Sequence, residues 1–159
     1  NINQPLDDHT DINLRILALI PDDYLPDVHS RLVMYKRIAG AETTDALREL
    51  QVEMIDRFGL LPEPVKNLMR VTEIKLRAAA IGISKLELGN NGGRIEFAAE
   101  TSIDPLQIVR LVQNHPQHYR LDGASALKLT IALADAETRL AHTDELLRQL
   151  SPAVNKKTG

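Results

Sequence analysis

Hydrophobic positions in the first half of the chain recur at two different spacings. Residues 13–20 alternate apolar and polar side chains up to Pro21, which predicts a β-strand. Three later runs repeat apolar side chains every three or four residues, the spacing of an amphipathic helix. The pattern predicts helices from about Pro26 to Gly40, from Thr43 or Thr44 to Gly59, and from about Glu63 to Ile81.

Each predicted helix has an apolar stripe that is expected to face the core. In the first helix the stripe is Val28, Leu32, Tyr35 and Ala39. In the second helix it is Leu47, Leu50, Met54 and Phe58.

The pattern after Gly82 is different, because charged and apolar side chains now alternate. Residues 85–88 and 94–97 alternate in this way, and 90–93 (Asn-Asn-Gly-Gly) tolerate the positive φ of a hairpin turn. The rest of the chain predicts a helix from Asp104-Pro105 to about His115, a second hairpin of 119–121 and 127–133, and a last helix over 136–150. The predicted buried side of this last helix is Ala136, Leu140, Thr143, Leu147 and Leu150.

The predicted fold class is α+β. The strands come as two hairpins plus an N-terminal strand, so we expect an antiparallel sheet covered by about five helices. We expect a linker over 1–11, a single α+β domain over 12–151 and a flexible tail over 152–159. The first residue is Asn and not Met, which indicates a piece of a longer protein.

Composition narrows the classes of function. The formal net charge is −3, which argues against binding duplex DNA by phosphate neutralisation alone. Aromatic residues are 3%, so bases would find few side chains to stack on. The chain has no cysteine, which excludes disulfides, thiolate zinc sites and a cysteine nucleophile.

No motif in the sequence assembles a catalytic, metal or cofactor site. The five histidines include no pair at metal-ligand spacing on a helix. His115 and His118 are three residues apart, but Pro116 between them would break a helix. The glycine-rich residues 89–93 join two strands, whereas a phosphate loop leads from a strand into a helix. We therefore expect a non-catalytic chain without a metal or cofactor of its own.

Four carboxylates follow one another along the second predicted helix. They are Asp45, Glu49, Glu53 and Asp56. The spacings of four, four and three residues place them in one ridge beside the apolar stripe. This acidic ridge is either a solvated surface, which the residues alone favour, or a docking surface for an arginine-rich partner.

Smaller basic patches leave an alternative function open. They are Arg31, Lys36 and Arg37 on the first helix, with Lys66, Arg70 and Arg77 on the third. Solubility explains such patches by default, and a nucleic-acid contact is the alternative.

Several short segments together resemble a known family. They are 21–27 (Pro-Asp-Asp-Tyr-Leu-Pro-Asp), Arg31-Leu32, Tyr35-Lys36-Arg37, Glu53, Asp56-Arg57-Phe58-Gly59, Pro62, Pro64-Val65 and Leu68. With these residues the chain resembles the C-terminal domain of bacterial transcription-repair coupling factors. The resemblance is clear over roughly residues 12–100, and the second half matches mainly in the order of its elements.

The resemblance implies a regulatory role inside a larger, cytoplasmic bacterial protein. Members of the family are ATP-driven translocases on double-stranded DNA that displace stalled RNA polymerase and recruit the excision-repair protein UvrA. ATP and magnesium belong to their motor domains. Their C-terminal domain docks on a UvrB-like module of the same chain and masks its UvrA-binding surface. The resemblance therefore favours the docking interpretation, with Glu49, Glu53 and Asp56 facing arginines of that module.

Overall fold

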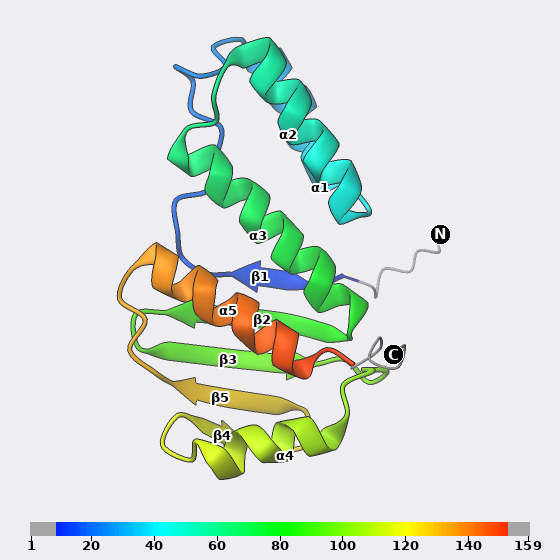
Figure 1. Ribbon diagram of the computed structural model, residues 1–159, viewed down its shortest axis with the longest axis vertical. Helices are drawn as coiled ribbons and strands as arrows, with labels where there is room; N and C mark the ends of the chain where they lie inside the picture. The colour runs from blue at the N-terminus through cyan, green and yellow to red at the C-terminus, as the bar shows by residue number, and fades with distance from the viewer. Residues whose placement is uncertain (1–8, 153–159) are drawn as a thin grey trace, which may run out of the picture. The chain divides into compact units, whose positions relative to one another are not determined.

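The computed structural model describes residues 9–152. The predicted linker therefore lies mostly, and the predicted tail almost wholly, outside the described residues. Within them the chain forms five helices and five strands, which confirms the α+β class (Figure 1). In order they are β1 (Asp11–Asn13), α1 (Val28–Ala39), α2 (Thr44–Phe58), α3 (Glu63–Ala80), β2 (Ile83–Gly89), β3 (Gly92–Phe97), α4 (Pro105–Asn114), β4 (Tyr119–Leu121), β5 (Ala126–Thr130) and α5 (Ala136–Leu150).

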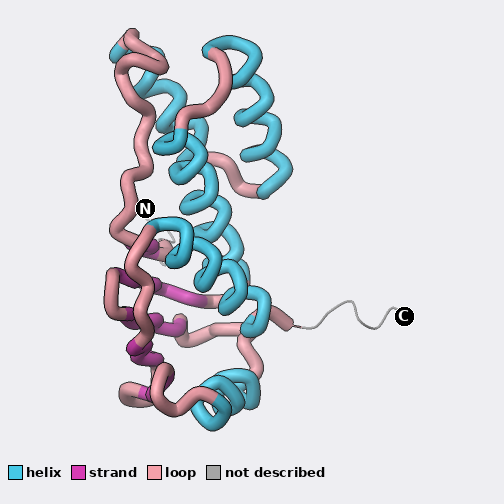
Figure 2. The backbone as a smooth tube through the Cα atoms, turned by 60° about the vertical axis from the view of Figure 1, so that its left-hand side comes forward, coloured by secondary structure: helices cyan, strands magenta, loops and turns pink. Residues whose placement is uncertain are grey.

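The described strands form one mixed sheet in the order β1-β2-β3-β5-β4. Both predicted hairpins are present and antiparallel, while β1 pairs with β2 in parallel. In Figure 2 the strands form one layer, and α5 lies to one side of it. The side chains buried on the inner face of the sheet are Leu86, Leu88, Ile95, Leu127 and Leu129.

The chain divides into two compact units. Among the described residues, the sheet unit comprises 9–15 together with 77–152, and the helical unit comprises 16–76. The helical unit contains α1, α2 and most of α3. Its core consists of Ile20, Leu25, Met34, Ile38, Leu47, Leu50, Met54, Val65 and Met69.

The predicted N-terminal strand is present, but its predicted bounds of 13–20 are wrong, because β1 covers only 11–13. The alternation is real, since Leu14 and Ile20 are buried and the residues between them alternate in exposure. The backbone of 17–20, however, bonds to single groups of the helical unit and not to a neighbouring strand. Ile20 N–H donates to the Tyr35 hydroxyl at 2.7 Å, and the Asn67 side chain donates to the Leu17 carbonyl at 3.0 Å. The sequence pattern therefore predicted correctly which side chains are buried, but it wrongly implied that this segment pairs with a neighbouring strand.

The predicted apolar stripe of α1 also needs correction. Val28 and Leu32 are about 60% exposed, and the core side chains of this helix are Met34 and Ile38. Pro26 lies before the helix, because Asp27 is the N-cap and accepts a hydrogen bond from the backbone N–H of Ser30 at 2.9 Å. The side of α1 that faces the core is therefore the one with Met34 and Ile38, and not the one with Val28 and Leu32.

The buried residue Arg139 ties the sheet unit together. Arg139 on α5 is 6% exposed and donates five hydrogen bonds, all to carbonyl oxygens. Nη1 reaches the backbone oxygens of Leu14 and Arg15, each at 3.0 Å. Nη2 reaches the side-chain oxygen of Asn90, in the β2–β3 turn, at 2.6 Å. The remaining two bonds go to the segment that leads into α5.

These bonds secure the point where the chain leaves the sheet. Arg15 has φ +54°, an uncommon conformation for a residue with a side chain. The backbone N–H of Arg15 donates a hydrogen bond to the side-chain oxygen of Asn13 at 3.0 Å. This bond closes a local turn directly after β1. Arg139 then satisfies the two carbonyl oxygens that the turn directs away from the strand ladder.

Arg139→Met keeps an aliphatic side chain of similar length but removes the guanidinium. We expect it to lower the free energy of unfolding by about 2–4 kcal/mol, because several carbonyl groups lose their donors. Arg148→Met is the matched control on the same helix, since the Arg148 side chain is 67% exposed. The control is expected to change stability by less than about 0.5 kcal/mol. Urea unfolding followed by circular dichroism measures both. Equal effects of the two substitutions would contradict the role given to Arg139.

Candidate functional site

The orientation of α2 is fixed by its ends and by its buried side. The Thr43 hydroxyl accepts a hydrogen bond from the N–H of Ala46 at 3.0 Å, so Thr43 is the N-cap of the two residues that the sequence offered. Gly59, with φ +102°, ends the helix as predicted. The predicted stripe is confirmed, with Leu47, Leu50 and Met54 buried and Phe58 half-buried. The opposite side of α2 is consequently left at the surface.

The exposed side of α2 carries three of the four predicted carboxylates. Asp45, Glu49 and Asp56 are exposed. Val52 lies between them along the helix and is 56% exposed. We call these four residues the acidic face of α2. Asp45, Glu49 and Val52, with Arg48, line a shallow depression, so the surface combines negative charge with an apolar patch.

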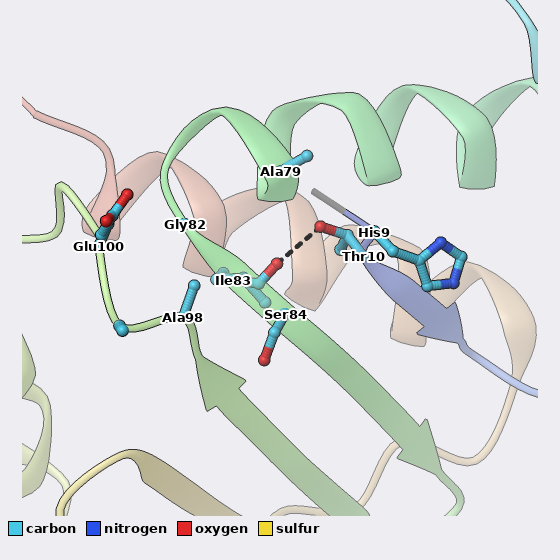
Figure 3. Close-up of a pocket in the computed structure, with 9 residues that line it drawn as sticks. His9, Thr10, Ala79, Gly82, Ile83, Ser84, Ala98 and Glu100 are labelled. Atoms are coloured by element: carbon cyan, nitrogen blue, oxygen red, sulfur yellow. Dashed lines mark hydrogen bonds between the residues drawn. The ribbon is translucent and has the colours of Figure 1, made fainter. Parts of the chain in front are cut away.

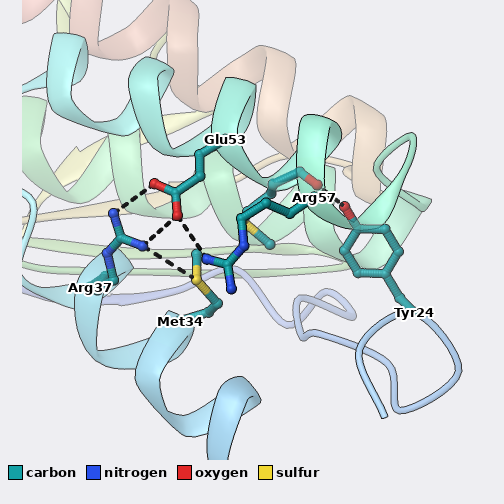
Figure 4. Close-up of polar contacts among 6 residues, drawn as sticks. Tyr24, Met34, Arg37, Glu53 and Arg57 are labelled. Carbon is teal, nitrogen blue, oxygen red and sulfur yellow. Dashed lines mark hydrogen bonds and ion pairs between the residues drawn. The ribbon is translucent and has the colours of Figure 1, made fainter. Parts of the chain in front are cut away.

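The fourth carboxylate, Glu53, is engaged within the helical unit (Figure 4). Its two oxygens accept hydrogen bonds from both terminal nitrogens of Arg37 on α1, each at 2.7 Å. A third bond comes from Arg57, one turn along α2, at 2.8 Å. Glu53 therefore joins α1 to α2, whereas the sequence suggested that the four acids were equivalent.

Neighbouring aromatic groups complete this junction. The Arg57 guanidinium lies over the Phe58 ring at 4.7 Å from the centroid, a cation–π contact. The Tyr24 ring packs edge-on against Phe58, and its hydroxyl donates to the Gly59 carbonyl at 2.8 Å. The C-terminal end of α2 is thus held by several side chains at once.

The two guanidinium groups change the acidity of Glu53. Hydrogen bonds from Arg37, and then from Arg57, lower the pKa of Glu53 to about 2. The same carboxylate raises the pKa of Arg37. Glu53 therefore stays ionised at any pH at which the folded chain is commonly studied, and its charge is already balanced by two cations.

Titration of Glu53 is a test of this junction. The pKa is lower in the folded chain than in the unfolded one, so the stabilisation is complete above about pH 4.5 and is lost as the pH falls towards 2. The stability difference between the native chain and Glu53→Gln should therefore shrink between pH 5 and pH 2.5, as measured by urea unfolding. In Arg37→Met, the pKa of Glu53 read by NMR should rise towards its ordinary value. An unchanged pKa in that variant would show that Arg37 does not hold the carboxylate.

Most of the predicted basic patches are engaged inside the chain. Arg31 donates to the Leu25 carbonyl at 2.9 Å, and Arg37 is held by Glu53. Arg77 forms an ion pair with Asp144 on α5 at 2.8 Å. These contacts give the arginines a structural role and reduce the positive charge available to a nucleic acid.

One hollow of the sheet unit offers little chemistry (Figure 3). It lies where α3 leads into β2, and small side chains such as Ala79, Ser84 and Ala98 line it. The Thr10 hydroxyl is already bonded to the Ile83 carbonyl at 2.9 Å. Its two ionisable residues, His9 and Glu100, lie on opposite sides of it in Figure 3.

A second hollow lies between α4, β4 and α5 and contains three of the histidines. The rings of Tyr119 and His142 are stacked, and the Tyr119 hydroxyl lies 3.1 Å from His142 Nε2. Burial lowers the pKa of His142, with a smaller contribution from His118. Within residues 9–152 no group of three or more potential ligands is arranged to hold a metal ion. No helix in the same range is long and apolar enough to cross a membrane.

The chain is similar to proteins of known name. It matches the family model described as the TRCF domain over residues 14–108, more than half of its length. It is 45% identical over 141 residues to the transcription-repair-coupling factor of Escherichia coli (strain K12), and 45% identical over 141 residues to that of Haemophilus influenzae. Each alignment covers 89% of this chain and 12% of the relative, so the chain spans only a small part of the length of these relatives.

A solved structure shows the same fold. The crystal structure of the C-terminal domain of a transcription-repair coupling factor matches with a TM-score of 0.71 at 22% identity. The match covers 89% of this chain and 94% of the other chain. The arrangement of helices and strands is therefore shared over almost the whole of both chains.

Proposed function

Because the chain belongs to the TRCF domain family, we propose that it is a non-catalytic regulatory domain that docks on a UvrB-like module of its own protein and masks the surface that binds UvrA. The larger protein would be an ATP-dependent translocase on double-stranded DNA that displaces stalled RNA polymerase in transcription-coupled repair. ATP and magnesium would act in its motor, not in this domain.

The acidic face of α2 is the observation that carries this proposal. The buried stripe on the other side of the helix directs Asp45, Glu49 and Asp56 outwards together. Carboxylates in a row are suited to arginines of a partner, because each guanidinium can bind a carboxylate through two parallel hydrogen bonds. The exposed Val52 adds an apolar contact that would exclude water from these pairs.

A weak contact of this kind is sufficient for masking. A domain tethered by a short flexible linker has an effective concentration on the order of mM at its docking site. A contact of only a few kcal/mol then keeps the site covered most of the time. A modest change elsewhere in the protein could release the domain, which a regulatory contact requires.

Glu53 has a different part in this proposal from its neighbours. Its carboxylate is shared by Arg37 and Arg57, so it holds α1 and α2 together beside the acidic face. Glu49 and Asp56 are the carboxylates that we assign to direct contact.

Charge reversal on the acidic face tests the assignment. In a protein that contains both this chain and the UvrB-like module, the double substitution Glu49→Arg and Asp56→Arg should raise the apparent affinity for UvrA by about tenfold or more, because it weakens the competing contact. Isothermal titration with UvrA measures the change. Deletion of the whole chain sets the upper limit of the effect.

Two comparison variants make the result specific. Glu100→Arg reverses one carboxylate, half the charge change of the double substitution, at an exposed position of the sheet unit and should leave UvrA binding unchanged. Glu53→Arg should weaken docking and also lower the thermal stability, since it breaks both ion pairs. If deletion of the chain leaves UvrA binding unchanged, masking is wrong. If deletion strengthens binding and the reversal does not, only the surface is wrong.

A further inference from the structure

The face of the sheet that points away from α5 carries charged side chains on β2, β3, β5 and β4. On β2 and β3 the half-buried outward residues are Lys85, Glu87, Arg94 and Glu96, while Leu86 and Ile95 between them are fully buried. On β5 and β4 the outward residues Lys128 and Arg120 are exposed. We call this surface the outer face of the sheet.

The strand register places three cations side by side on this face. Arg94 on β3 lies opposite Lys128 on β5, and Lys128 lies opposite Arg120 on β4. We call these three residues the cation row. Neighbouring strands are about 4.8 Å apart, so the row extends for roughly 10 Å across the sheet.

The cation row departs from the charge pairing of the rest of the sheet. On the neighbouring row Asp11 lies opposite Lys85, and Lys85 lies opposite Glu96, so that signs alternate. Glu87 is likewise opposite Arg94. Like charges directly opposite each other destabilise a sheet, and the cation row has two such pairs in succession. A local cost of this kind, in a chain of net charge −3, indicates a surface selected for something other than folding.

Arg94 already shows which chemical group this surface binds. Its guanidinium is bonded to Glu96 at 3.0 Å and to Asp122 in the β4–β5 turn. Arg94, with smaller contributions from Lys128 and Arg120, holds the pKa of Asp122 below its usual range. Carboxylates are thus the groups that Arg94 binds within the chain, while the neighbouring Lys128 and Arg120 are exposed.

We propose that the cation row is a docking surface for an acidic helix of a protein partner, one that presents carboxylates at positions i, i+4 and i+7. Side chains at these spacings lie about 5–6 Å apart along a helix, close to the separation of adjacent strands. A helix that crosses the strands would bring carboxylates directly to the exposed Lys128 and Arg120, and a third beside Arg94, whose guanidinium already holds Glu96 and Asp122. This surface is independent of the acidic face of α2 and of the masking proposed above.

The outer face suits a short acidic segment better than a nucleic acid. Glu87, Glu96 and Asp122 flank the row and would repel the phosphates of a long polyanion on both sides. The outward positions of β2 to β5 carry no aromatic side chain on which a base could stack, since Tyr119 is buried and Phe97 shares the parity of buried Ile95. A helix with a short line of carboxylates can meet Lys128 and Arg120 at the end of the row that lies away from Glu87.

The test uses the intact chain and a defined probe. The probe is an alanine-rich helical peptide of about 20 residues with Glu at i, i+4 and i+7, compared with the same peptide carrying Gln. Fluorescence anisotropy should show that the Glu peptide binds at about 20 mM salt at least tenfold more tightly than the Gln peptide, and that binding weakens at about 200 mM salt. The double substitution Arg120→Gln and Lys128→Gln should reduce the affinity for the Glu peptide about tenfold or more.

A matched control separates the row from charge in general. Lys36→Gln with Lys66→Gln removes the same charge from exposed positions of the helical unit and should leave peptide binding unchanged. Equal loss in both double variants would overturn the proposal, and so would equal binding of the Glu and Gln peptides. Binding of a short duplex DNA more tightly than the Glu peptide, lost in the Arg120→Gln and Lys128→Gln variant, would also overturn it in favour of a nucleic-acid surface.

Discussion

A buried guanidinium decides where the first strand of the sheet ends. The carbonyl groups of Leu14 and Arg15 leave the strand ladder at a turn with positive φ, and such groups need donors when they are buried. Arg139 supplies these donors and also binds Asn90 in the β2–β3 turn. One side chain of α5 therefore joins the end of β1 to the hairpin that follows α3. These bonds hold the chain at the point where it leaves β1, the edge strand beside β2.

In the helical unit the comparable constraint is the buried stripe of α2. Met54 is fully buried, and Leu47 and Leu50 pack on the same side. Once this side is fixed, the period of the helix determines which side chains reach solvent. The acidic face is a consequence of that geometry, and so is the position of Glu53 at the edge, within reach of Arg37 on α1. Structure and proposed function of α2 thus arise from one orientation.

Much of this architecture could be predicted from local signals. Helix α2 was found with its cap, its end and its core stripe, because Thr43, Gly59 and a regular apolar period act within a few residues of one another. The two hairpins were found for the same reason. The signals failed where partners lie far along the chain. Residues 13–20 alternate like a strand, but among them only Asn13 pairs in the sheet, and the backbone of 17–20 bonds to Tyr35, Pro64 and Asn67.

The candidate sites divide in the same way. Helical spacing places Asp45, Glu49, Glu53 and Asp56 on one side of α2, but it cannot show that Arg37 captures Glu53. Arg139 also has no local signal, since it occupies a position beside the predicted buried stripe of α5 and its acceptors come from three separate segments.

The distribution of charge matters more for binding than its sum. A formal net charge of −3 indicates a nearly neutral surface, and on that ground alone neither an acidic nor a basic partner is favoured. Folding separates the charges, however. It gathers carboxylates on α2 in the helical unit, and it brings Arg94, Lys128 and Arg120 together from three strands of the sheet unit. The acidic face of α2 can be predicted from one segment, whereas the cation row exists only once β3, β5 and β4 are in register. Surfaces built across strands are therefore the ones that composition and linear spacing conceal, and a chain without catalytic motifs can still carry two surfaces of opposite sign.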